Sequence, residues 1–123
     1  MVQEIDMNYM LQPQERDENL HVIMFYGATC PPCNNTMPYY EMLAEKVLDK
    51  TDAVKFYRIN AWEPEEQKNY CKDVLKVEGV PHFKCFFREQ NIHSREGGGD
   101  IAELSKFLVE TIDKIFKDYG VKI

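Results

Sequence analysis

The feature that most constrains this chain is a pair of closely spaced cysteines between an apolar segment and a long helical pattern. Residues 21–26 form an almost continuous apolar run of strand length, which is typical of a central strand covered on both faces. Gly27 breaks this run, and the motif Cys30-Pro31-Pro32-Cys33 follows directly. Beyond the motif, up to about residue 50, apolar side chains recur at helical spacing, namely Tyr40, Leu43, Ala44, Val47 and Leu48. The chain is therefore predicted to pass from a buried strand into a helix that starts at the two thiols.

This placement favours redox chemistry. Two cysteines three residues apart on one helical turn can close a small disulfide ring. The unpaired amides and the dipole at a helix N-terminus stabilise a thiolate at Cys30. Thiols in such motifs have pKa values of about 3.5–7.5, against about 8.5 for a free cysteine. Pro31 and Pro32 lack an N–H, so we expect the amides of Cys33 and Asn34 to be the main donors. Cys30 is then the predicted nucleophile, and Cys33 resolves the mixed disulfide.

The remaining pattern predicts the order β(α)βαβαββα, an α/β fold. A strand–helix–strand crossover followed by a hairpin implies a central mixed sheet of four to five strands, with helices on both faces. Asp100 and Glu103 predict a capping box at the start of the last helix. The other expected elements are a short edge strand at 5–9, a loop or brief helix at 13–19, strands at 54–60, 82–87 and 92–95, a polar hairpin at 88–91, and a helix at 63–76.

Length and charge limit the classes of function. With 123 residues, of which 44% are hydrophobic, the chain is expected to form a single domain over residues 1–123. Its net charge of −6 and its lack of a basic run argue against nucleic acid as a partner. No apolar run approaches the ~20 residues that span a bilayer, and the acidic start lacks the apolar core of a signal peptide. We therefore expect a cytoplasmic protein without a membrane partner.

A zinc or iron–sulfur site is the main alternative for the cysteine pair. A CxxC pair normally needs a second pair of ligands to hold zinc. Cys71 and Cys85 are too far apart in sequence to supply one, and the histidines have no metal-ligand spacing. We predict no metal, and we expect these two cysteines to be buried core residues.

With these residues in place, the chain resembles the thioredoxin family over nearly its whole length after residue 20. The strand at 22–26 runs into the cysteine motif as the family's second strand does, and Pro38 matches a proline inside the following helix. Val80-Pro81 matches the family's cis-proline, and Gly97 matches a glycine after the last strand. The resemblance implies a thioredoxin fold, with Cys30 and Cys33 as the catalytic pair.

The resemblance also implies a surface for binding the substrate around the dithiol. Its predicted residues are Thr29, Val80, Pro81, His82 and Gly97. A proline beside the thiolate leaves the Val80 backbone free to pair with an extended substrate. Two readings stay open for His82, which either reaches the dithiol or points from its strand into solvent. Trp62 is expected to pack, or else to present a surface ring that helps to bind substrate.

This chain departs from the family's pattern at four positions, one of which is His82, where threonine is common. Family members carry an acid where Met24 stands, which resembles a general base for the resolving cysteine. The lysine that often accompanies that acid is replaced by Arg58, and the usual tryptophan before the first cysteine is replaced by Thr29.

The expected function is the reduction of protein disulfides by the dithiol, with no cofactor other than the Cys30–Cys33 disulfide itself. The expected partners are client proteins with disulfides and a reductant, either a disulfide reductase such as thioredoxin reductase or a glutathione system. Two alternatives remain open from the sequence: a thiol oxidase or disulfide isomerase of the same fold, and a binding module without enzymatic activity.

Overall fold

A computed structural model of the chain describes residues 1–11 and 17–123. A five-stranded mixed sheet has the order β1-β3-β2-β4-β5. The three strands β1, β3 and β2 are parallel, whereas β4 runs antiparallel to both β2 and β5. The strands are β1 (Val2–Ile5), β2 (Leu20–Tyr26), β3 (Val54–Asn60), β4 (His82–Phe87) and β5 (Gln90–Glu96). The predicted α/β fold with a mixed sheet is therefore confirmed.

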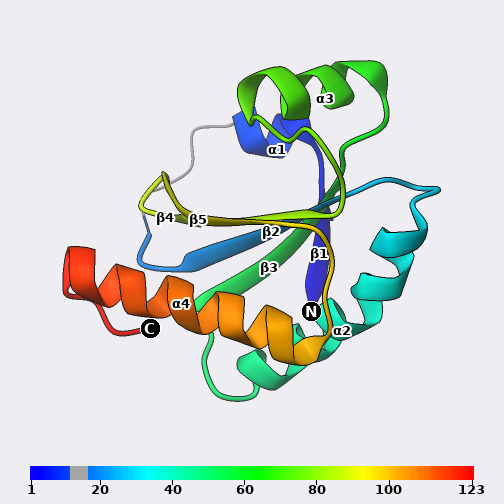
Figure 1. Cartoon of the computed structure of the whole chain (residues 1–123). Helices are drawn as coiled ribbons and strands as arrows, with labels where there is room; N and C mark the ends of the chain where they lie inside the picture. The colour runs from blue at the N-terminus through cyan, green and yellow to red at the C-terminus, as the bar shows by residue number, and fades with distance from the viewer. Residues whose placement is uncertain (12–16) are drawn as a thin grey trace.

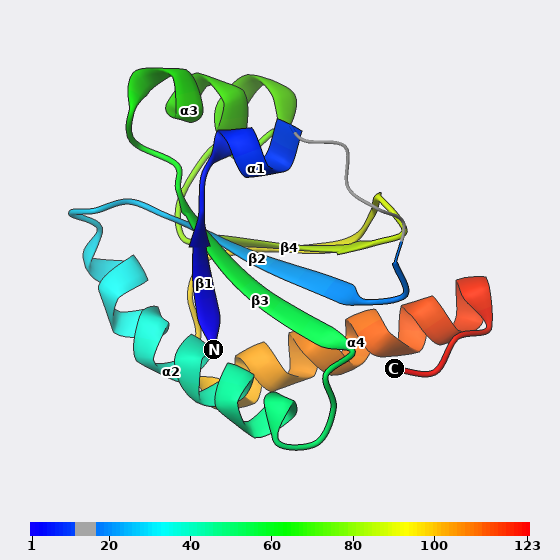
Figure 2. The ribbon, with the colours of Figure 1, turned by 180° about the vertical axis from the view of Figure 1, so that it is seen from behind.

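Helices cover both faces of the sheet, as predicted. The long helices α2 (Pro31–Leu48) and α4 (Ile101–Tyr119) lie on one face (Figure 1). The opposite face carries α1 (Met7–Leu11), α3 (Glu65–Asn69) and a π-helical turn, η1 (Tyr70–Val74). Figure 2 shows the same division from behind. Each face buries its own apolar cluster, and the larger cluster lies under α2 and α4.

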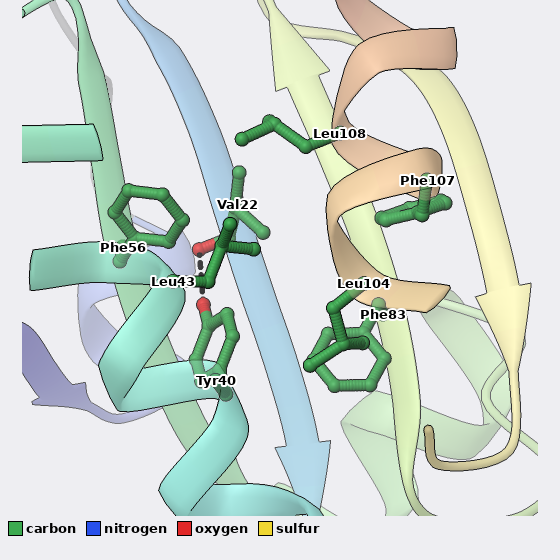
Figure 3. Close-up of a pocket in the computed structure, with 8 residues that line it drawn as sticks. All are labelled: Val22, Tyr40, Leu43, Phe56, Phe83, Leu104, Phe107 and Leu108. Carbon is green, nitrogen blue, oxygen red and sulfur yellow. Dashed lines mark hydrogen bonds between the residues drawn. The ribbon is translucent and has the colours of Figure 1, made fainter. Parts of the chain in front are cut away.

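The larger core is closely packed around Tyr40 (Figure 3). The buried Tyr40 hydroxyl donates to the carbonyls of Val22 (3.1 Å) and Tyr57 (2.8 Å), so α2 is fixed to two strands. A void of about 10 Å³ lies beside this ring. That volume is at the lower limit for one water molecule, so the void is a packing defect and not a ligand pocket.

The N-terminal segment differs from its predicted alternating strand. β1 ends at Ile5, and the chain turns into α1 instead of continuing to Tyr9. The Asp6 carboxylate accepts a hydrogen bond from the Tyr9 amide (3.0 Å). An Asp in this position caps a helical turn, and this local bond replaces strand pairing. The predicted loop or helix at 13–19 lies largely outside the described residues.

Two other elements also have different bounds from those predicted. The helix expected from residue 63 begins only at Glu65, and its second half is the π-helical turn, where the Leu75 amide donates to the Tyr70 carbonyl. The hairpin between β4 and β5 is tighter than expected. Arg88 and Glu89 alone form its turn, both with positive φ, as the two-residue type I′ turn requires. The capping box of Asp100 and Glu103 is present as predicted.

Candidate active site

The two cysteines of the motif lie at the N-terminus of α2. Cys30 is the N-cap residue, the prolines occupy the first helical positions, and a disulfide joins Cys30 to Cys33, whose Cα atoms are 5.2 Å apart. The Cys33 amide donates to the Cys30 sulfur (3.2 Å), as expected. The Asn34 amide instead donates to the Cys30 carbonyl oxygen (3.0 Å), because it makes the first backbone bond of the helix. One amide, not two, therefore faces the sulfur of Cys30.

The loop before β4 brings a second backbone segment to the dithiol. The Cys30 sulfur lies 3.9 Å from the Val80 carbonyl oxygen, and the Val80–Pro81 peptide bond is cis. The Gly97 amide donates to the Pro81 carbonyl oxygen (2.9 Å), and Gly97 has a φ of +86°, which favours glycine. Thr29 is exposed directly before Cys30. Four of the five predicted substrate-binding residues therefore gather around the disulfide: Thr29, Val80, Pro81 and Gly97.

Access to the two sulfurs is unequal. Cys30 is 4% exposed and Cys33 is 1% exposed, so the first cysteine is the more accessible one. Thr36, on the next turn of α2, accepts a hydrogen bond from the Gly99 amide (3.3 Å). This bond holds the connection between β5 and α4 against the helix that carries the dithiol. The surroundings of the disulfide are therefore assembled from three separate chain segments.

His82 is placed differently from both readings of the sequence. It is 5% exposed, and its ring makes an edge contact with Phe25 in the smaller core, with centroids 6.1 Å apart. Phe83, the next residue, packs with the cysteines in the larger core. Because successive strand residues alternate between faces, His82 points away from the core that holds the dithiol. Its Nε2 atom has no hydrogen-bond partner among the described residues, and burial lowers its pKa.

The position of the family's buried acid is apolar in this chain. Met24 is fully buried in the same apolar cluster as Cys30 and Cys33. Its neighbour Arg58 pairs with Glu4 (2.8 Å) and Glu41 (3.7 Å). No ion pair within the described part of the chain reaches the thiols from this side.

Tyr26, at the end of β2, joins the same charged network. Its hydroxyl donates to the two carboxylate oxygens of Glu4, at 2.8 and 2.9 Å. Partial burial and this carboxylate together raise the pKa of Tyr26 to about 12. Tyr26 therefore stays protonated at neutral pH and acts as a donor.

The other two cysteines are unpaired core residues, as predicted. Cys71 and Cys85 are both buried. Burial raises the pKa of the Cys71 thiol to about 11 and that of the Cys85 thiol to about 12. Both are therefore protonated at neutral pH and unreactive in the folded protein.

The described residues contain neither a metal site nor a membrane span. No group of three or more His, Cys, Asp or Glu residues among them could hold a metal ion. Within the same residues, every helix is too short or too polar to cross a bilayer.

Trp62 is, besides His82, a residue whose placement the sequence left open. Its ring lies against the backbone of Gly27, where a Cβ atom would overlap three ring carbons. The side chain is nevertheless 43% exposed. Trp62 therefore both packs and presents a ring to solvent. The sequence signal for this location was the position of Trp62 just after β3. Because β2 and β3 are parallel, their C-terminal ends lie at the same end of the sheet.

The two cysteines lie at a helix N-terminus, beside the loop that contains the cis Val80–Pro81 bond, on a mixed sheet. This arrangement defines the class of thiol–disulfide oxidoreductases. The family model described as Thioredoxin matches residues 4–110. The chain belongs to the thioredoxin family. Among curated protein sequences, none matches the chain.

Solved thioredoxin structures are similar to the chain over most of its length. Thioredoxin f from spinach chloroplast is 25% identical and covers 92% of this chain and 85% of its own, with a TM-score of 0.72. Malassezia sympodialis thioredoxin (Mala s 13) is 26% identical and covers 90% of each chain, with a TM-score of 0.68. Fasciola hepatica thioredoxin, at 20% identity, covers 78% of this chain and 84% of its own, with a TM-score of 0.64, and supports the fold alone.

Proposed function

We propose that this protein reduces disulfides in client proteins through Cys30 and Cys33. The observation that carries the proposal is the disulfide at the start of α2, whose Cys30 sulfur lies 3.9 Å from the Val80 carbonyl and accepts from the Cys33 amide. This position gives Cys30 a stabilised thiolate and an adjacent backbone segment on which a client can dock.

In the reduced protein, the Cys30 thiolate attacks one sulfur of the client disulfide. A Cys30–client disulfide forms, and the client's other sulfur leaves as a thiolate that takes up a proton. Cys33 then loses its proton and attacks the Cys30 sulfur, which releases the second client thiolate. Two electrons pass to the client, and the protein is left with the Cys30–Cys33 disulfide. A disulfide reductase or glutathione then returns the two electrons, and no further cofactor takes part.

The hydrogen bonding around Cys30 supports a reductant rather than an oxidant. A dithiol becomes more oxidising as its reduced form is stabilised. Here the two prolines remove two amide donors, and the Asn34 amide is used by the helix, so one amide remains for the sulfur. A modestly stabilised thiolate gives the electrons away more readily. We propose a reducing compartment such as the cytoplasm as its setting, because thiols are kept reduced there.

The client docks, in this proposal, on the segment that surrounds the disulfide. The backbone of Val80 pairs with an extended stretch of the client, while Thr29, Pro81 and Gly97 shape the adjoining surface. His82 packs on Phe25 on the opposite face of the sheet. It supports the loop of Val80 and Pro81 from that side and does not touch the client.

A turbidity assay of insulin reduction by dithiothreitol tests the proposal. The wild type should accelerate the reaction, and Cys30→Ser should abolish the acceleration. Cys33→Ser should stop turnover, and the pre-reduced variant mixed with insulin in the absence of dithiothreitol should accumulate a disulfide between Cys30 and insulin. Cys71→Ala, which removes an unpaired core thiol, is the matched control and should retain the acceleration.

The same variants separate the alternatives. No acceleration by the wild type, combined with client binding that survives Cys30→Ser, would favour a binding module. Faster oxidation of a reduced client than reduction of an oxidised one, in the same glutathione buffer, would favour an oxidase. Either result would contradict the proposed direction of electron flow.

A further inference from the structure

Trp62, the only tryptophan of the chain, lies against the turn that carries Cys30. The ring covers the backbone of Gly27 so closely that no side chain fits there. The Gly27 carbonyl in turn accepts a hydrogen bond from the Cys30 amide (3.3 Å). The segments that follow β2 and β3 leave the sheet at the same end (Figure 1). The ring of Trp62, a residue distant in sequence, thus packs on the same turn that positions the predicted nucleophile, Cys30.

The backbone around Trp62 is fixed by hydrogen bonds. The Asn60 side chain accepts from the amides of Trp62 (2.9 Å) and Glu63 (3.3 Å). The side chain of Gln67, which is 5% exposed, donates to the carbonyls of Asn60 (2.7 Å) and Glu63 (3.3 Å). A ring held in this way loses little conformational freedom when it binds a partner. Trp62 is therefore a preorganised contact surface.

The residues that follow the ring add negative charge. Glu63, Glu65 and Glu66 are exposed. None of them belongs to an ion pair within the described parts of the chain. Glu63 also acts on Tyr26, at the end of β2, where its charge contributes to the raised pKa. An aromatic face attracts cations, and so do unpaired carboxylates beside it.

We propose that Trp62 and Glu63 form a docking position for a cationic side chain of the client, so that the preferred substrates are disulfides flanked by Lys or Arg. This inference rests on the proposed function and adds a substrate class to it. The cation lies over the exposed part of the Trp62 ring and near the Glu63 carboxylate. The ring's other face stays against Gly27 and keeps the docked residue close to Cys30.

A pair of model substrates tests the preference. Two peptides with the same disulfide differ only in having Arg or Gln beside one cysteine, and kcat/KM is measured for each. The wild type should prefer the Arg peptide about two- to five-fold, as an exposed cation–π contact implies. Trp62→Ala and Glu63→Gln should each bring this ratio toward one. Trp62→Phe, which keeps a ring, should retain part of it.

Val74→Ala is the matched control. It removes an exposed apolar side chain from η1 and should leave both the ratio and the rates as in the wild type. Equal rates for the two peptides with the wild type would overturn the docking position while leaving the proposed function intact. A wild type that reduces neither peptide would overturn both. Should Trp62→Ala unfold, Glu63→Gln still decides the matter, because the change is confined to an exposed side chain.

The fluorescence of Trp62 gives a reading that does not depend on activity. Peptides in which Ser replaces both cysteines bind without reaction, and they are titrated into the oxidised protein. The Arg peptide should change the emission at lower concentration than the Gln peptide, and added salt should weaken this difference. Identical titrations with both peptides would contradict the proposal.

Discussion

Met24 lies directly opposite Arg58 across strands β2 and β3, yet the arginine turns away to Glu4 and Glu41. Met24 itself is fully buried in the cluster that contains both thiols. The side chain at position 24 is thus close-packed in an apolar cluster. The neighbouring Arg58 carries a positive charge, but its ion pairs are with other residues. Among the residues that the structure describes, no buried carboxylate is therefore present to take the proton of Cys33.

Met24→Asp should therefore speed the second step of the exchange. A carboxylate in this cluster would accept the Cys33 proton directly or through a water, and we expect release of the mixed disulfide to rise at least about tenfold at neutral pH. Burying the carboxyl should also destabilise the fold by about 2–4 kcal/mol. Stopped-flow release between pH 6 and 9 and urea unfolding measure the two effects. Met24→Leu is the control, and unchanged release in Met24→Asp would refute the alignment of this strand.

Alkylation of the reduced protein should select Cys30 alone. Iodoacetamide reacts with thiolates, and Cys30 is at the helix N-terminus, so its pKa should lie below the ~8.5 of a free thiol. Cys71 and Cys85 have pKa values raised to about 11 and about 12 by burial and should stay unmodified until the protein unfolds. Mass spectrometry of peptides after labelling at pH 7 gives the distribution. Equal, slow labelling of Cys30 and Cys33 would count against the assigned roles.

Gly27→Ala tests the packing of Trp62. A Cβ at position 27 would overlap the ring, so the ring must move, and overpacking of this kind typically costs about 1–3 kcal/mol. The emission of Trp62 should shift, and the urea midpoint should fall. Gly79→Ala is the matched control, since a Cβ there meets no atom within 4 Å. Similar behaviour of the two variants would show that Trp62 does not rest on Gly27.

The buried His82 should make stability depend on pH. Burial and nearby Lys84 lower its pKa, while Glu96 acts in the opposite direction. The unfolded state then binds more protons, so stability falls as the pH drops below the ordinary histidine pKa of about 6.5, by at most about 1.4 kcal/mol per pH unit. Below the folded-state pKa of His82, this loss levels off. His82→Leu should flatten the curve of unfolding free energy between pH 7 and 5. Parallel curves for wild type and variant would contradict this assignment.

The sequence predicted those helices and strands whose apolar or helical pattern extends over many residues. The apolar run that became β2, the periodic helices α2 and α4, and the capping box at Asp100 all depend on local composition and spacing. Short elements were less predictable because single contacts decide them. The Asp6 carboxylate ends β1 early, and two residues with positive φ make the β4–β5 turn tighter than the polar segment suggested.

Within the site, the sequence motif predicted the positions of Cys30 and Cys33, but it did not predict which residues surround them. The contact between Cys30 and Val80 joins segments fifty residues apart, and the sequence indicated it only through the family resemblance. The face on which His82 lies depends on the register of β4, where a shift of one residue reverses every side chain. The position of Trp62 depends on a close approach to Gly27, which no local pattern encodes.

The equilibrium reduction potential of the Cys30–Cys33 pair tests the central claim most directly. The wild type is equilibrated in glutathione buffers of graded ratio, the thiols are trapped, and the reduced fraction is counted. If this protein reduces client disulfides and only one amide donates to its Cys30 sulfur, its potential should be near that of thioredoxins, about −270 mV. A value at or above about −180 mV, where disulfide isomerases lie, or a pair that does not exchange reversibly with glutathione, would contradict the account.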